Sequence, residues 1–203
     1  MKLVFTGIQW CGKGTQAILL VEKYWFTLLE MWWEFRKVIE SGTELGNKLK
    51  TVLDSWAQVD DTLGKEIMES VIKAQTAENI IFDWFIRNTW NKEIFDRVLP
   101  EYQVVFFQLS EEKAIERLLV RMYDPETWET FPAGVKINPK NWNELITRKD
   151  DNEAAILKRI DEFVTKTVKI VEEQKKEGKV IKVNADQTPE EVHQEIIKKL
   201  NLK

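Results

Sequence analysis

The sequence has few cysteines, histidines and glycines, and it has no long apolar run. A single cysteine, Cys11, excludes an internal disulfide and a cysteine-based zinc site, and it suits a reducing cytoplasm. A single histidine, His193, stands among charged residues, so we expect it to be solvated rather than catalytic. Because no apolar run could span a bilayer and no signal peptide opens the chain, we expect a cytoplasmic protein with no membrane partner.

Net positive charge is also absent. The formal net charge is −4, so bulk attraction to nucleic acid is not indicated, and an anionic ligand would need local basic residues. With 203 residues the chain can bury one sizeable core and still carry small inserted lobes. Composition therefore favours a globular protein whose ligand site is built locally.

The most informative stretch is Gly7-Ile8-Gln9-Trp10-Cys11-Gly12-Lys13-Gly14-Thr15. It follows an apolar run at 3–5 and opens a helical pattern near Lys13, which is the context of a phosphate-binding loop. Backbone N–H groups of such a loop, with the helix N-terminus, attract phosphate oxygens. Lys13 would reach the β and γ phosphates, Thr15 would place its hydroxyl on Mg²⁺, and Cys11 would be a small loop residue rather than a nucleophile.

Apolar runs alternate with helical patterns along the rest of the chain, which predicts a doubly wound α/β sheet. The helix expected at 152–177 has an apolar face that ends before Gly178, and Thr188-Pro189-Glu190-Glu191 is a capping box that starts the last helix. The expected strands are Leu3–Phe5, Phe26–Leu29, Ile80–Asp83, Val104–Leu109 and Val180–Val183. The apolar face of the helix at 152–177 comprises Ile156, Ile160, Phe163, Val164, Val168 and Val171.

Two segments interrupt this alternation. Residues 30–59 have helical patterns without a clear strand, and residues 122–150 contain a near-repeat, Asp124-Pro125-Glu126-Thr127-Trp128 and Asn138-Pro139-Lys140-Asn141-Trp142. Each half of the repeat is typical of a turn between short extended arms. We therefore expect a core of residues 1–29, 60–121 and 151–203, a helical lobe at 30–59, and a small β-rich lid at 122–150 that holds no zinc.

Several further motifs follow one another along the chain, and their order and spacing are informative. They are Gly12-Lys13-Gly14-Thr15-Gln16, Tyr24-Trp25-Phe26, Arg36, Ser41-Gly42-Thr43-Glu44-Leu45-Gly46, Asp83-Trp84-Phe85-Ile86-Arg87-Asn88, Arg117, Arg121, Leu145-Ile146-Thr147-Arg148-Lys149-Asp150-Asp151 and Arg159. In this order and spacing the chain resembles the adenylate kinase family over essentially its full length. The resemblance implies a P-loop NTPase-type five-stranded parallel sheet with helices on both faces, a lobe that binds the nucleoside monophosphate, and a lid.

The resemblance also implies roles for individual residues. Arginine suits phosphoryl transfer because its planar fork makes bidentate phosphate contacts. The implied catalytic residues are Lys13, Arg87, Arg121, Arg148 and Arg159. The implied ATP-binding residues are Gly7, Gly12, Lys13, Gly14, Thr15, Gln16, Arg117, Arg121 and Ala185. The implied AMP-binding residues are Met31, Arg36, Val59, Trp84, Arg87, Asn91, Arg148 and Arg159. Thr15 and Asp83 would hold Mg²⁺, largely through water. We expect a monomer that handles ATP, AMP and ADP.

The chain departs from the family mainly by its tryptophans. Seven of nine stand where the family or its turns expect glycine, namely Trp10, Trp25, Trp32, Trp56, Trp84, Trp128 and Trp142. Trp33 replaces an aspartate, Trp90 stands at a variable position, Met31 replaces a threonine, and Asn91 replaces the glutamine that reads adenine. One base change turns the glycine codon GGA into UGA. If the source organism reads UGA as glycine, a host or a translation table that reads UGA as tryptophan would write tryptophan at those positions. This would explain both the scarce glycines and the abundant tryptophans. The alternative is deliberate engineering of aromatic pockets or probes.

Three functional readings remain open. The chain could be an adenylate kinase that transfers the γ-phosphoryl of Mg-ATP to AMP, impaired where tryptophans crowd the phosphate and AMP sites. It could bind nucleotides without turnover. It could also be a kinase for another nucleoside monophosphate. Activity assays beside nucleotide-binding measurements separate the first two, and a panel of acceptors tests the third.

Overall fold

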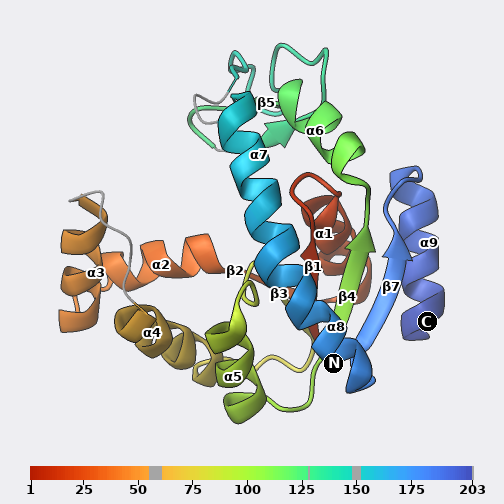
Figure 1. Cartoon of the computed structure of the whole chain (residues 1–203). Helices are drawn as coiled ribbons and strands as arrows, with labels where there is room; N and C mark the ends of the chain where they lie inside the picture. The colour runs from red at the N-terminus through yellow and green to blue at the C-terminus, as the bar shows by residue number, and fades with distance from the viewer. Residues whose placement is uncertain (55–60, 128, 148–151, 203) are drawn as a thin grey trace.

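A five-stranded parallel sheet forms the centre of the molecule (Figure 1). The computed structural model describes residues 1–54, 61–127, 129–147 and 152–202. The strands β1 (Lys2–Gly7), β2 (Thr27–Glu30), β3 (Ile80–Asp83), β4 (Gln103–Gln108) and β7 (Val180–Asn184) follow the order β2-β3-β1-β4-β7. Every neighbouring pair is parallel. The predicted α/β class and all five predicted strands are confirmed, with the bounds of Ile80–Asp83 unchanged and the ends of the other strands within two residues of the prediction.

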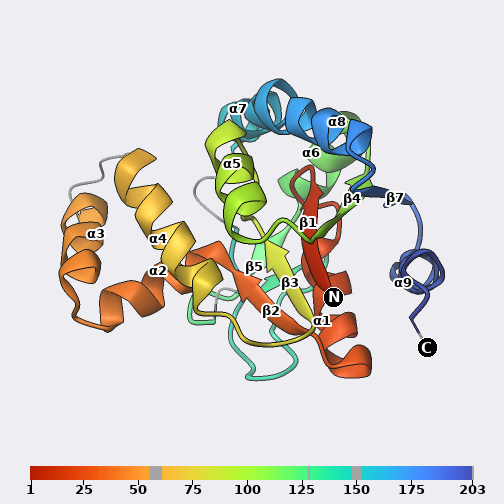
Figure 2. The ribbon, with the colours of Figure 1, turned by 90° about the horizontal axis from the view of Figure 1, so that it is seen from below.

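Helices cover both faces of the sheet. In Figure 2, α1 (Lys13–Tyr24) and α9 (Pro189–Leu200) lie on one side, and α5 (Thr89–Val98) and α8 (Val168–Lys176) lie on the other. Strand β1 shows why both faces are apolar: Leu3 and Phe5 pack in one buried cluster, and Val4 between them packs in the other. Successive side chains of a strand point to opposite faces, so a buried parallel strand needs a continuous apolar run.

The helix boundaries follow the predicted local signals. The Thr188 hydroxyl accepts a hydrogen bond from the Glu191 N–H, the Glu191 carboxylate accepts one from the Thr188 N–H, and Pro189 is the first residue of α9. Gly178 follows α8 in a left-handed conformation with φ +75°. These observations confirm the capping box and the helix-ending glycine.

The prediction that His193 is solvated is wrong. The side chain is fully buried between α9 and α1, its Nδ1 lies 3.2 Å from Gln16 Oε1, and its ring centroid lies 6.1 Å from that of Tyr24. Charged neighbours in sequence misled the prediction. On a helix, His193 shares a face with Ile196 three residues later, and that face packs on α1.

The predicted helix at 152–177 is present but is not uniform. It comprises α7 (Glu153–Glu162), a π-helical turn (Phe163–Thr167) and α8. The π turn holds one more residue per turn than an α-helix, so it shifts the register of the side chains that follow. Val164, predicted on the apolar face, is 37% exposed, whereas Thr167 and Gln174 are buried.

Residues 31–54 form the helices α2 (Met31–Glu40) and α3 (Glu44–Asp54), and α4 (Asp61–Lys73) follows. Figure 1 shows these helices projecting to one side of the sheet. Gly46 explains part of the motif at 41–46, because a Cβ atom there would collide with the backbone carbonyl of Val38. The glycine thus permits close packing of α3 on α2.

Residues 122–147 lie beyond the carboxyl ends of the strands, beside α6 (Glu111–Leu119) and α7 (Figure 1). Short antiparallel strands β5 (Met122–Tyr123) and β6 (Thr130–Phe131) accompany isolated bridges. The near-repeat forms two matching turns, since Asp124 N–H donates to Glu129 O and Asn138 N–H donates to Asn143 O, each at 2.9 Å. The described residues of this segment therefore contain short antiparallel pairings joined by turns, and the lid itself stays a prediction.

A buried carboxylate organises this segment. Asp124 is fully buried and accepts hydrogen bonds from the side-chain amides of Asn138 (2.6 Å), Asn141 (2.7 Å) and Asn143 (3.2 Å). Burial raises the pKa of Asp124, but the hydrogen bonds outweigh it, and the net pKa is well below its usual value. Among the described residues, no cluster of three or more histidine, cysteine, aspartate or glutamate side chains could hold a metal ion.

Candidate active site

The phosphate-binding loop connects β1 to α1 at the carboxyl end of the central strand. Gly7 allows the loop to fold closely, because a Cβ atom there would lie 2.8 Å from both Cys11 Sγ and Phe107 O. Gly12 precedes α1 in a left-handed conformation with φ +91°. Gly14 and Thr15 in the first turn of α1 are exposed. The loop thus presents a helix N-terminus and an accessible hydroxyl, as an anion site requires.

Lys13 is folded back onto this loop. Its Nζ donates to Gly7 O at 2.8 Å and to Ile8 O at 3.1 Å, and it lies 3.4 Å from Cys11 Sγ. The side chain is buried, so its positive charge sits beneath the loop. Burial raises the pKa of Cys11 in spite of Lys13, which supports the interpretation of Cys11 as a small packing residue rather than a nucleophile.

Asp83 ends β3, next to the loop, and pairs in register with Phe5. The carboxyl group is buried, and its Oδ1 accepts no hydrogen bond from any described residue. Burial and the nearby Glu30 raise the pKa of Asp83 to about 6, although Lys13 opposes them. A buried oxygen ligand without a protein partner fits a hard divalent cation such as Mg²⁺. Asp83 and the Thr15 hydroxyl could therefore hold that cation.

A cavity of about 510 Å³ opens beside the loop. Of the predicted site residues that the structure describes, those lining it are Gly7, Lys13, Met31, Trp84, Arg87 and Asn91. The volume suits a small-molecule ligand. The other predicted site residues that the structure describes do not line the cavity: Gly12, Gly14, Thr15, Gln16, Arg36, Asp83, Arg117, Arg121, Arg159 and Ala185. Val59 and Arg148 lie outside the described residues.

Three of the predicted phosphate-binding arginines contact tryptophans. The guanidinium of Arg87 lies 4.6 Å from the ring centroid of Trp84, and that of Arg121 lies 5.4 Å from Trp10. Arg36 lies 5.0 Å from each of Trp32 and Trp33. Each arrangement is a cation–π contact. Each stacking contact thus restricts where the guanidinium can lie, because its in-plane N–H groups, which bind phosphate, can move only if the stack shifts.

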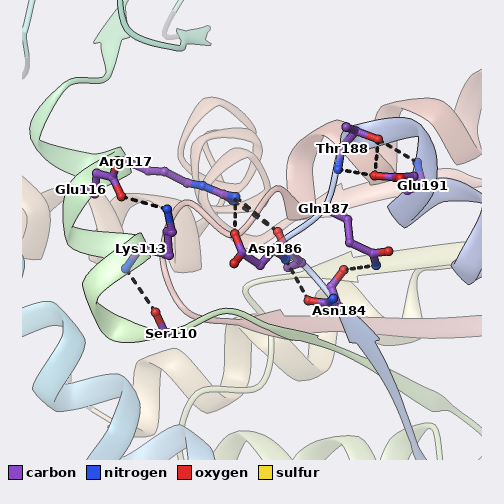
Figure 3. Close-up of polar contacts among 10 residues, drawn as sticks. Ser110, Lys113, Glu116, Arg117, Asn184, Asp186, Gln187, Thr188 and Glu191 are labelled. Atoms are coloured by element: carbon purple, nitrogen blue, oxygen red, sulfur yellow. Dashed lines mark hydrogen bonds and ion pairs between the residues drawn. The ribbon is translucent and has the colours of Figure 1, made fainter.

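Arg117 and Arg159 are engaged with carbonyl groups. Figure 3 shows Arg117 extending from α6 toward the loop after β7, where it lies 3.6 Å from Asp186 Oδ1. Both of its terminal nitrogens are 3.4 Å from the carbonyl oxygen of Ala185, a buried residue. Arg159 Nε donates to Ala155 O at 3.2 Å, within α7.

Asn91 contributes to backbone geometry. Its Oδ1 accepts from the N–H groups of Arg87 (3.0 Å) and Asn88 (3.1 Å), and its Nδ2 lies 3.5 Å from Met68 Sδ. Asn88 in turn accepts from the Asn91 N–H, which completes a capping box at the start of α5. The oxygen of Asn91 is therefore used to fix the loop that carries Arg87.

Four tryptophans adopt a backbone conformation that favours glycine. Trp10 (φ +62°), Trp25 (+58°), Trp84 (+66°) and Trp142 (+64°) lie in the left-handed region, where Asn201 is the other non-glycine residue described. Such a conformation is an outlier for a bulky residue. Trp32 belongs to α2 and has right-handed helical geometry. Trp56 and Trp128 lie outside the described residues.

The site also includes residues that sequence reasoning missed. Four residues of the π turn and the position before it also line the cavity, namely Glu162, Phe163, Lys166 and Thr167. No motif marks them, because their position depends on where the helix departs from α geometry. Among the described residues, no helix is long and apolar enough to cross a membrane.

The parallel sheet and the phosphate-binding loop together are those of a P-loop kinase with an α/β core. A model of the adenylate kinase family matches residues 5–179. The adenylate kinase of Alkaliphilus oremlandii is 32% identical, and the match covers 98% of each chain. The adenylate kinase of Chloroherpeton thalassium is 30% identical, over 97% of this chain and 96% of that protein. The adenylate kinase of Francisella tularensis subsp. novicida is also 30% identical, over 99% of each chain. The chain belongs to the adenylate kinase family, a family of nucleoside monophosphate kinases.

Proposed function

We propose that this chain transfers the γ-phosphoryl group of Mg-ATP to AMP, reversibly, with two ADP as products. An oxygen of the AMP phosphate attacks the γ-phosphorus, and the bond from that phosphorus to the β,γ-bridging oxygen breaks. The observation that carries the proposal is the cavity in which Lys13 of the loop and Arg87 after β3 face the same space, together with Met31 and Asn91.

Each charged residue has a task in this reaction. Lys13 would leave its loop carbonyls to hold the β and γ phosphates, where charge develops during transfer. Arg36 and Arg87 would hold the AMP phosphate, and Arg117, Arg121, Arg148 and Arg159 would neutralise the ATP phosphates. Thr15 and Asp83 would hold Mg²⁺, largely through water. When bound, Mg²⁺ supplies positive charge that neutralises the triphosphate and orients it.

We also propose that tryptophans impair this activity. Trp10 and Trp84 combine a left-handed backbone with stacking on Arg121 and Arg87, and Trp32 stacks on Arg36. The left-handed tryptophans support the recoding hypothesis, in which these positions are glycine in the source organism. The coding DNA tests it: UGA codons at these positions would support recoding, and UGG codons would contradict it.

A second candidate is a kinase for another nucleoside monophosphate. Met31 replaces the family threonine, and Asn91 uses its oxygen on the Arg87 and Asn88 N–H groups, so adenine recognition is less secure. A third is a nucleotide-binding protein without turnover.

A coupled assay of ADP formation separates these candidates. ATP is supplied with AMP, CMP, UMP or GMP in turn, and binding of a two-nucleotide inhibitor is measured in parallel. Preference for AMP supports the proposal, preference for another acceptor supports the second candidate, and binding without turnover supports the third. We further propose that the protein is cytoplasmic and that it is a monomer. Sedimentation of the purified chain would test the monomeric state.

A further inference from the structure

Both backbone polar groups of Arg87, its N–H and its carbonyl, form hydrogen bonds with side chains from other positions. Its N–H donates to Asn91 Oδ1 at 3.0 Å, and its carbonyl oxygen accepts from Thr167 Oγ1 at 3.0 Å. Asn91 belongs to the nearby helix α5, but Thr167 comes from the π turn, eighty residues along the chain. The loop that carries Arg87 is therefore tied to the π turn of the long helix, and both segments line the cavity.

The π turn is what brings Thr167 to this carbonyl. Within a helix, a threonine hydroxyl commonly bonds to a carbonyl of its own preceding turn. The Val168 N–H bonds to Phe163 O, five residues earlier, as a π turn requires. Thr167 at the end of this turn is buried and donates outside its own helix. An uninterrupted α-helix would rotate position 167 relative to Arg87.

The same turn shapes the electrostatics around Arg87. Burial lowers the pKa of the Arg87 guanidinium, and the nearby Glu162 carboxylate opposes this effect. Glu162, Phe163, Lys166 and Thr167 all line the cavity that Arg87 lines. The π turn thus contacts the Arg87 backbone through Thr167, and the residue before the turn, Glu162, acts on the Arg87 guanidinium.

We propose that Thr167 is a positioning residue for Arg87, and through it for the phosphate of the nucleoside monophosphate. This inference rests on the proposed function, which assigns Arg87 to that phosphate. Thr167 does not contact the reacting atoms. Its hydroxyl sets where the Arg87 peptide lies, and so where the guanidinium can reach. A misplacement of about 1 Å at such a contact is enough to weaken catalysis strongly.

The test compares Thr167→Val, which keeps the shape and removes the donor, with Thr167→Ser, which keeps the donor. Calorimetric titration with AMP and, separately, with ATP gives affinities that do not depend on turnover. Because the Arg87 carbonyl would lose its hydrogen bond, Thr167→Val should bind AMP about tenfold more weakly and ATP as the unaltered chain does. Thr167→Ser should restore AMP affinity. Where turnover is measurable, KM for AMP should rise more than kcat falls.

Arg87→Ala provides the second arm. If Thr167 acts through Arg87, adding Thr167→Val to Arg87→Ala should not weaken AMP binding further. Equal loss of AMP and ATP affinity in Thr167→Val, failure of Thr167→Ser to restore AMP binding, or additive effects in the double variant would each overturn the inference. Binding of AMP without any turnover in the unaltered chain would overturn the proposed function alone, whereas no AMP binding at all would overturn both.

Discussion

The two ends of the central sheet carry polar clusters of opposite character. At the amino end, Asp96 accepts from Lys92 (2.6 Å), Lys179 (2.8 Å) and the Tyr102 hydroxyl (2.9 Å), and Gln174 donates to that hydroxyl. Burial raises the pKa of Asp96, but the hydrogen bonds and ion pairs of this cluster together outweigh it, so the net pKa is lowered. Every partner is another protein group, so the cluster has the form of a structural network.

At the carboxyl end the same kinds of group are arranged differently. Asp83 Oδ1 accepts no hydrogen bond from the described residues, Lys13 is folded onto its own loop, and Arg87 stacks on Trp84. Buried polar groups without protein partners are uncommon, and one with a shifted pKa beside a phosphate-binding loop indicates a candidate functional site. The comparison separates a cluster that holds the fold from one that the proposed function assigns to substrates.

The largest effect should come from Lys13→Ala. Lys13 is the lysine of the loop motif and lines the cavity, so its loss should lower the rate of ADP formation about a hundredfold or more. Lys179→Ala, at the amino end, is the matched control and should leave the rate unchanged. Steady-state kinetics of both variants checks the prediction, and similar rates for Lys13→Ala and the unaltered chain would contradict it.

Asp96→Asn should show the opposite pattern. Removal of the carboxylate charge weakens the contacts with Lys92 and Lys179, and we expect a loss of about 1–2 kcal/mol in the free energy of unfolding for this partly exposed cluster. Urea denaturation measures this loss, with Asp161→Asn at an exposed site as the control. A selective fall in turnover without a loss of stability would break the distinction between the two ends.

Trp25→Gly and Trp142→Gly should each stabilise the protein by about 1 kcal/mol, because a left-handed backbone strains a bulky residue. These side chains are 87% and 81% exposed, so little burial is lost. Trp33→Gly in α2 is the control of opposite sign, since glycine inside a helix costs about 1 kcal/mol. Thermal unfolding distinguishes the two directions. Destabilisation by all three substitutions would remove backbone strain from the explanation.

The smallest effect should be a pH dependence of stability at His193. Burial first, and then Lys23, lower the pKa of His193, while Glu190 opposes them. A lowered pKa means that the neutral form is favoured in the folded state. The contribution of neutral His193 to folding stability is therefore fully present above the pKa of histidine in the unfolded chain, which is about 6.5. This contribution is lost as the pH falls below that value.

His193→Asn keeps a donor near the Nδ1 position and removes the titration. The difference in unfolding free energy between the unaltered chain and this variant should therefore shrink as the pH falls from 7.5 to about 5. Urea denaturation across this range measures it. A difference that does not change with pH would show that His193 is not held neutral.

The sheet was predictable because buried parallel strands need continuous apolar runs, as at 80–83 and 104–108. The loop was predictable because its glycines and Lys13 have fixed spacing. The π turn was not, since the sequence at 163–167 carries no glycine or proline to mark a break. The burial of His193 and the pairing of Thr167 with Arg87 depend on which helices pack together, and local patterns do not specify that.

The most direct test of the account is the rate of ADP formation by a variant with glycine at positions 10, 32 and 84. Replacement of these tryptophans removes the cation–π contacts that Trp10 makes with Arg121, Trp32 with Arg36 and Trp84 with Arg87, each worth about 0.5–2 kcal/mol, while Arg36 keeps its contact with Trp33. We predict a rise of about tenfold or more over the unaltered chain with ATP and AMP, and no such rise when Lys13→Ala is added. An unchanged rate and unchanged nucleotide affinity in the triple variant would contradict the claim that this is an adenylate kinase site obstructed by tryptophan.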